Sequence, residues 1–203
     1  YTNFLLDSGY WIDQFVNSIE NSNFASTVLY YDYENEYYAS HPYEDWYLSY
    51  MYDWSAVPAG KRGCSLMNVP SDANSLNSAL GSSRTLNYVE FHSYPAVSFN
   101  SNIESCYDQV KAIFPSATVL LGEYGRENAS EADQQATVLN LASRASTKNI
   151  PYNLHWQLWD NAIYTNTFGL AYSLNSPKDV MGGLSSLQNK ISNPDAEILN
   201  GAI

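Results

Sequence analysis

Acidic, amide, imidazole and phenol side chains follow several apolar runs of the sequence. Asn35 and Glu36 follow the first run, His92 and Tyr94 the third, and Glu123 the fourth. Two carboxyl groups hydrolyse a glycosidic bond with retention when they lie about 5–5.5 Å apart, one attacking the anomeric carbon and the other protonating the leaving oxygen. Glu36 and Glu123 are the candidates for such a pair.

Each candidate also has a simpler interpretation. Glu36 is the last residue of an acidic stretch that could be a solvated loop. Glu34, two residues earlier, would lie on the same face of an extended chain and could be mistaken for the catalytic residue. Glu123 is also compatible with a helix N-terminus, where the macrodipole favours a carboxylate. His92 is compatible with a structural histidine, and Tyr94 with packing in a turn before a proline.

Short β-rich apolar runs alternate with amphipathic stretches along the chain. We expect strands at about 27–31, 62–69, 86–91, 118–121 and 152–158, and helices at about 10–21, 72–80, 103–114, 131–147 and 180–191. Strands that read as unbroken apolar runs and alternate with helices are typical of a parallel sheet covered by helices. The sequence therefore predicts one α/β domain over 1–203, a TIM-barrel-like sheet of about five βα units, which is a partial or half barrel.

Four features of the sequence resemble the clan of (β/α)8 retaining glycoside hydrolases that includes the family 5 cellulases and mannanases. In that clan an Asn-Glu pair ends the fourth strand, a His-x-Tyr follows the sixth, a Glu ends the seventh and a Trp ends the eighth. This chain has the same features in the same order: Asn35-Glu36, His92-Ser93-Tyr94, Glu123, and Trp156 or Trp159. The resemblance covers about residues 10–192 and implies that the chain holds strands four to eight.

The resemblance implies a role for each of these side chains. Glu36 corresponds to the acid/base and Glu123 to the nucleophile, and the two carboxyl groups need different pKa values. Asn35 would hydrogen-bond the 2-hydroxyl of the sugar. Tyr94 would donate its hydroxyl to Glu123, and His92 would donate to that network or to the substrate.

One tryptophan near the last expected strand would provide an apolar platform for a pyranose ring. Trp156 and Trp159 lie three positions apart, so on one strand they would face opposite sides. The platform is Trp156 if the strand ends there, or otherwise Trp159. The aromatic-rich stretch 37–54 is either a further sugar-binding wall or an amphipathic helix around 43–52 that packs on the sheet.

Composition limits the classes of partner. The chain has 203 residues, 21 acidic and 9 basic side chains and a formal net charge of −12. Nine scattered cations cannot neutralise a run of phosphates, which argues against nucleic acid and anionic membranes. No run of about 18 apolar residues is present. A low content of charged residues (15%) together with 18 Tyr and 5 Trp favours a secreted protein that handles neutral polymers.

Cysteines and cofactors add little to the predicted chemistry. Cys64 and Cys106 form either one disulfide or two separate buried thiols. No Cys/His cluster suggests zinc, and a glycosidase of this kind requires no metal and no cofactor. A partial barrel exposes sheet edges, so we expect a homodimer or a second chain to complete it.

Three functions are compatible with these features. The first is a retaining glycoside hydrolase that cleaves β-glycosidic bonds of a neutral polysaccharide such as a β-glucan, mannan or xylan. The second is a non-catalytic carbohydrate-binding protein on the same scaffold. The second function is favoured because no residues of this sequence match the early strands of the clan, which carry an arginine near the nucleophile. The third is a different α/β protein in which the two glutamates coincide by chance.

Overall fold

The computed structural model describes residues 2–39, 44–95, 98–126, 130–155, 171–173 and 176–178. The chain divides into two compact units. Unit 1 comprises 1–92 and 105–120, and unit 2 comprises 93–104 and 121–203. The expected helix at 180–191 and the two candidate tryptophans, Trp156 and Trp159, lie outside the described residues.

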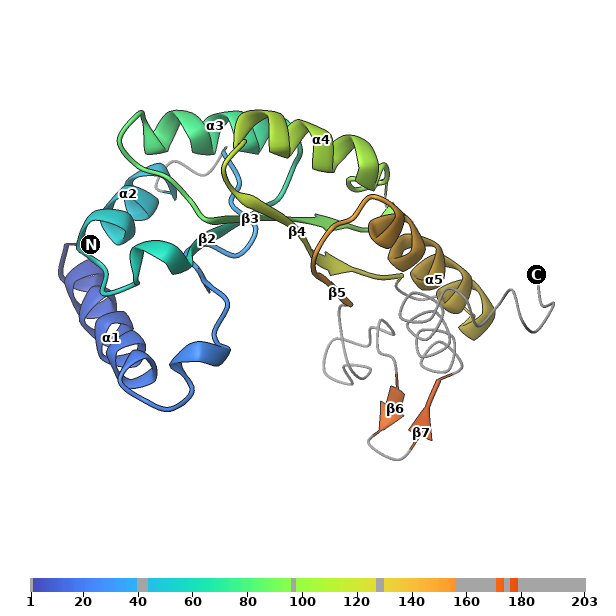
Figure 1. The fold of residues 1–203 in the computed structure, drawn as a ribbon, viewed down its shortest axis with the longest axis horizontal. Coiled ribbons are helices and arrows are strands. Elements are labelled where there is room, and N and C mark those ends of the chain that lie inside the picture. The colour runs from blue at the N-terminus through green and yellow to red at the C-terminus, as the bar shows by residue number, and fades with distance from the viewer. Residues whose placement is uncertain are drawn as a thin grey trace. The chain divides into compact units, whose positions relative to one another are not determined.

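Helices and strands alternate along most of the described chain (Figure 1). In order, the α-helices and strands are α1 (Thr2–Glu20), β1 (Tyr31–Asp32), α2 (Glu44–Trp54), β2 (Arg62–Leu66), α3 (Ser71–Leu80), β3 (Tyr88–Ser93), α4 (Ile103–Ile113), β4 (Thr118–Tyr124), α5 (Glu131–Thr147), β5 (Asn153–His155), β6 (Ala171–Ser173) and β7 (Ser176–Pro177).

Five strands form one parallel sheet in the order β1-β2-β3-β4-β5, and β6 and β7 form a separate antiparallel pair. Sequential strands that neighbour one another and are joined by helices have the topology of a (β/α) barrel. The predicted α/β class, with five parallel strands, is confirmed. The carboxyl ends of all five strands lie along the same edge of this sheet.

The sheet and helices bury the faces that the sequence pattern assigns to them. On β2 and β3, Cys64, Leu66, Val89 and Phe91 are fully buried. The apolar stripes of α3, α4 and α5 are buried as well, with Leu76 on α3 as one example, whereas Trp11 and Phe15 of α1 are exposed. Cys64 and Cys106 are two separate buried thiols, so the disulfide alternative is wrong.

Local signals for helix ends act as the sequence indicates. Gly81 ends α3 with φ +66, and its N–H donates to the carbonyls of Asn77 and Ser78. Ser130 caps α5 by accepting a hydrogen bond from the N–H of Asp133 at 3.2 Å. The helices α3, α4 and α5 therefore lie within one residue of their predicted bounds at either end.

The first two predicted strands are shifted or shortened. Residues 25–27 form a 3₁₀ turn, in which the Thr27 hydroxyl donates to the Phe24 carbonyl at 2.7 Å, so β1 begins only at Tyr31. Local side-chain to backbone bonds of this kind compete with strand pairing. Strand β2 ends at Leu66 because the Asp72 carboxylate captures the N–H of Asn68 at 2.7 Å.

Strands β3 and β4 extend two or three residues beyond the predicted ends. Strand β3 reaches Ser93, and β4 reaches Tyr124, which pairs with His155 of β5. His92 and Glu123 therefore lie on the last residues of strands rather than in the loops after them. A strand position fixes the direction of a side chain more firmly than a loop does.

Among the described residues, none of the helices combines the length and the apolar character that a membrane span needs.

We predict that Phe91→Ala destabilises the protein by about 3–5 kcal/mol, because Phe91 is fully buried on β3 and its removal leaves a cavity in the core. Urea unfolding followed by tryptophan fluorescence measures the change. Phe24→Ala is the matched control, since Phe24 is 71% exposed and its loss should change the stability by less than about 0.5 kcal/mol. Equal losses in both variants would contradict the placement of this core.

Candidate active site

Glu36 is carried by an irregular turn between two points of pairing with β2. Asp32 pairs with Gly63 and Tyr37 pairs with Leu66, so the segment that follows β1 has two more residues than the stretch of β2 beside it. Extra residues of this kind bend a strand and redirect a side chain. Tyr37 is fully buried and anchors the far end of the turn.

The backbone of Glu36 has φ +61, in the left-handed region. A non-glycine residue there costs on the order of 1 kcal/mol and persists only where neighbouring contacts fix it. One such contact is the hydrogen bond from the Glu36 N–H to Oγ of Ser65 on β2, at 2.6 Å. Strain that is held in place by surrounding contacts is concentrated at functional sites.

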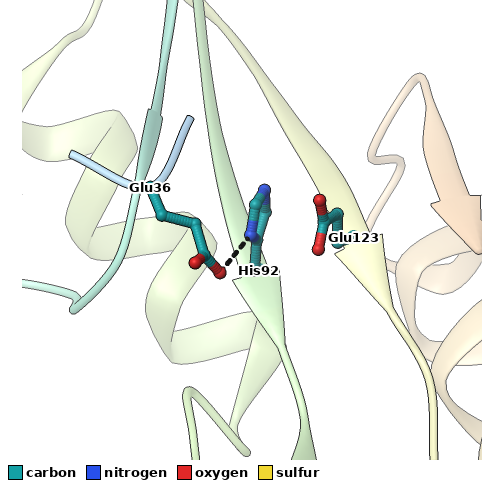
Figure 2. A group of neighbouring side chains, drawn as sticks. All are labelled: Glu36, His92 and Glu123. Atoms are coloured by element: carbon teal, nitrogen blue, oxygen red, sulfur yellow. Dashed lines mark hydrogen bonds and ion pairs between the residues drawn. The ribbon is translucent and has the colours of Figure 1, made fainter. Parts of the chain in front are cut away.

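The Glu36 carboxylate is bonded to His92 of β3. Nδ1 of His92 lies 2.8 Å from Oε1 of Glu36, and the imidazole is only 1% exposed (Figure 2). An ionised carboxylate can only accept, so Nδ1 is the donor. The solvated-loop interpretation of Glu36 is therefore wrong, because its carboxylate has a buried partner. His92 lies at the end of β3, as expected, and its donor is directed at Glu36.

The hydrogen bond from His92 lowers the pKa of Glu36, although partial burial of the carboxyl opposes the shift. This direction favours the ionised form. It suits a general base and is opposite to the direction that a resting general acid requires. Any role for Glu36 as an acid therefore depends on a change in its surroundings when substrate binds.

Glu123 is held in unit 2 by Tyr94. The Tyr94 hydroxyl donates to Oε2 of Glu123 at 2.5 Å, which is the hydrogen bond expected from the sequence. The Tyr94 ring also stacks on Phe99, with centroids 6.2 Å apart. Glu123 projects from β4 (Figure 2), so its interpretation as a helix N-terminal carboxylate is wrong.

Two acidic residues that sequence reasoning missed lie beside the Glu36 turn in unit 1. Asp32 accepts hydrogen bonds from the N–H groups of Ser65 and Glu34. Partial removal of its carboxyl from water and the nearby Glu90 raise the pKa of Asp32, although the residue as a whole is exposed. Glu90 is 7% exposed in β3, and a charged residue inside an apolar strand run was the available signal.

The side chains drawn in Figure 2 offer two carboxylates and one imidazole, which are also donor types that divalent metal ions accept. Acidic groups of this kind are common without a metal. Nδ1 of His92 and Oε1 of Glu36 are joined by a hydrogen bond. This bond explains why the two atoms are close without a metal ion between them.

The aromatic-rich stretch includes helix α2 (Glu44–Trp54), in agreement with the helical alternative. Leu48 and Met51 are buried, whereas Trp54 is 74% exposed and stacks on Tyr50. A hollow of about 370 Å³ lies in unit 1, and Tyr33 and Tyr47 are among its lining residues. The helix therefore both packs in the core and presents aromatic surface.

Asn35 lies exposed in the turn next to Glu36, where its amide is accessible. Four of the candidate residues predicted from the sequence lie in or next to strands of the sheet. Asn35 and Glu36 are in the turn after β1, His92 is at the end of β3 and Glu123 is at the end of β4. Tyr94 follows β3 directly and is the fifth.

No protein-family model matches the sequence, and no curated protein matches it. Two solved structures are similar in fold. One is a glycoside hydrolase family 17 β-1,3-glucanosyltransferase from Rhizomucor miehei, 16% identical with a TM-score of 0.50, over 66% of this chain and 54% of that chain. The other is a GH39 β-xylosidase from Caulobacter crescentus, 15% identical with a TM-score of 0.64, over 91% of this chain and 47% of that chain.

The chain spans about half the length of these two structures. At this identity the similarity establishes the fold, which is the α/β fold of two glycoside hydrolases. Neither neighbour is described as a family 5 enzyme, so the resemblance to family 5 stays a prediction.

We predict that His92→Leu raises the pKa of Glu36 toward the ordinary glutamate value of about 4.3, because the hydrogen bond that stabilises the carboxylate is lost. Titration of the Glu36 side-chain carboxyl by ¹³C NMR measures the shift. His92→Asn is the matched control, since its amide N–H lies near the position of Nδ1 and should retain much of the lowering. An unchanged pKa in His92→Leu would contradict the bond.

Proposed function

We propose that the protein is a retaining glycoside hydrolase that cleaves β-glycosidic bonds of a neutral polysaccharide by double displacement. The observation that carries the proposal is that two glutamates at the carboxyl ends of parallel strands each have a dedicated donor. His92 donates to Glu36, and Tyr94 donates to Glu123. Carboxylates oriented in this way at this edge of a (β/α) sheet are typical of catalytic groups.

Glu123 acts as the nucleophile in this proposal. Its carboxylate accepts the Tyr94 hydroxyl through Oε2, and this bond orients the carboxylate that attacks the anomeric carbon. The Tyr94 ring stacks on Phe99, which limits rotation of the donor. An oriented nucleophile accelerates the reaction because the geometry of attack is prepared before the substrate arrives.

Glu36 acts as the acid/base. It donates a proton to the leaving oxygen in the first step and accepts a proton from water in the second. The hydrogen bond from His92 favours the carboxylate, the form needed in the second step. A sugar that covers Glu36 excludes water, which raises the pKa of this half-buried carboxyl and prepares the acid form for the first step.

The remaining candidates recognise the sugar. Asn35 hydrogen-bonds the 2-hydroxyl beside the acid/base, a contact that strengthens in the transition state. Trp156 or Trp159 provides the pyranose platform. The two similar structures are described as a β-1,3-glucanosyltransferase and a β-xylosidase, which supports a β-linked glycan. The net charge of −12 favours a neutral polymer over an acidic one.

Location and assembly complete the proposal. The polymer substrate and the low content of charged residues favour a secreted protein. A second copy or a second chain covers the open sheet edge of β1, which has β2 on one side only in the described sheet.

We predict that a 2-deoxy-2-fluoro-β-glycoside with a good leaving group forms a covalent adduct on Glu123. Fluorine slows both steps by destabilising the oxocarbenium-like transition state, and the leaving group restores the first, so the intermediate accumulates. Intact-mass spectrometry and peptide mapping locate the label. Glu123→Gln should give no adduct, and a label on any other carboxylate would contradict the assignment.

The same experiment distinguishes a carbohydrate-binding protein that does not catalyse. The exposed Trp54, stacked on Tyr50, offers a flat apolar surface that would serve such a protein. Glycan binding by calorimetry, with no label and no turnover, would support this second function over the first.

We predict that Glu36→Ala slows hydrolysis of an alkyl β-glycoside by about 10²–10⁴-fold, because a poor leaving group needs protonation. Glycosylation by an activated aryl β-glycoside should change far less, since its leaving group needs no acid. Steady-state and burst kinetics with both substrates measure the difference, and the alkaline limb of the pH profile should disappear.

Glu34→Ala is the matched control, because Glu34 is a second glutamate of the same turn, two residues from Glu36. A loss in Glu34→Ala as large as in Glu36→Ala, or equal losses with both leaving groups, would contradict the assignment of Glu36 as the acid.

A further inference from the structure

We propose that Ser65 is a positioning residue for Glu36: its buried hydroxyl holds the turn that aims the Glu36 carboxylate at His92. The inference rests on the proposed acid/base role of Glu36 and extends it to a residue on β2 that contacts no reacting atom. It concerns unit 1 alone, since Ser65, Glu36 and His92 all belong to that unit.

The Ser65 hydroxyl forms two hydrogen bonds with the turn. It accepts from the Glu36 N–H at 2.6 Å and donates to the Glu34 carbonyl at 2.9 Å. Ser65 is fully buried, so its hydroxyl is shielded from water, whereas Glu34 and Glu36 at the other ends of the two bonds are partly exposed. One hydroxyl therefore clamps the backbone on both sides of Asn35.

The Ser65 backbone is fixed in turn by its neighbours. Its N–H donates to Oδ1 of Asp32 at 3.0 Å, and its carbonyl accepts from the Tyr37 N–H at 2.9 Å. Oδ1 of Asp32 also accepts from the Glu34 N–H at 3.3 Å. Ser65 is thus hydrogen-bonded to the start of the turn at Asp32, to its middle at Glu34 and Glu36, and to its end at Tyr37.

This clamp explains how the left-handed conformation of Glu36 persists. A φ of +61 is unfavourable for glutamate, and the Glu36 N–H has its acceptor on the Ser65 side chain. Without that hydroxyl, the Glu36 N–H loses its acceptor, while the Glu34 carbonyl keeps the Ser65 backbone N–H at 3.3 Å, and the turn can relax to an ordinary φ. The carboxylate would then leave Nδ1 of His92.

Ser65→Ala tests the proposal through the pKa of Glu36, measured by ¹³C NMR titration. We expect that pKa to rise toward the ordinary value of a glutamate, because the carboxylate loses the aligned donor of His92 even though the imidazole is still present. We also expect kcat to fall by about 10–10²-fold with a smaller change in KM, since misplacement of a catalytic group by about 1 Å has effects of that size.

Ser93→Ala is the matched control for the titration. Ser93 is also a fully buried strand serine, and its hydroxyl donates to a backbone carbonyl, that of Asn100, at 2.9 Å. Its loss should leave the pKa of Glu36 unchanged. A Glu36 pKa that is the same in Ser65→Ala as in the unmutated protein would overturn the proposal.

Hydrogen exchange in the unmutated protein provides a second test that does not depend on a variant folding. The Glu36 amide should exchange slowly although it lies in a turn, because its proton is held by the buried Ser65 hydroxyl. Exchange at the rate of an open loop would overturn the proposal. If the unmutated protein hydrolyses no glycoside while Ser65→Ala still shifts the pKa of Glu36, the acid/base role fails and the positioning role stands.

Discussion

The hydrogen bond between the buried imidazole of His92 and the carboxylate of Glu36 is the interaction on which the candidate site depends. It joins a regular strand, β3, to an irregular turn after β1, and therefore fixes in space a side chain that the turn alone would leave variable. The bond also favours the ionised form of Glu36, because it lowers the pKa of that carboxyl. The same bond therefore positions the Glu36 carboxylate and favours its ionised form. Ser65 supports this bond by holding the backbone of Glu36.

Glu123 is arranged on the same principle with a different donor. A phenol in place of an imidazole orients the carboxylate, and the carboxylate lies on β4 itself rather than on a turn. A strand position needs no clamp, whereas the turn of Glu36 needs Ser65 and Asp32. The two glutamates therefore differ in what holds them, which is consistent with different tasks: a nucleophile that keeps one geometry and an acid/base that responds to its surroundings.

Much of the fold could be predicted from sequence because its signals are local. The apolar periodicity of α4 and α5, with the Ser130 cap of α5, predicts bounds within one residue at either end. The bond from Tyr94 to Glu123 is also predicted, as an implication of the family resemblance. Strand β1 was misplaced because a Thr27 turn competes with pairing. Ser65 was missed because its role depends on the register of β2 against the turn, which no spacing within one segment reveals.

The stereochemistry of hydrolysis tests the central claim most directly, because it reports whether two carboxyl groups act on one sugar by double displacement. Proton NMR of the first product released from a β-glycoside distinguishes the two anomers before mutarotation. We predict the β-anomer, formed with net retention through a glycosyl-enzyme intermediate. Initial formation of the α-anomer, which requires a single displacement by water, would contradict the account.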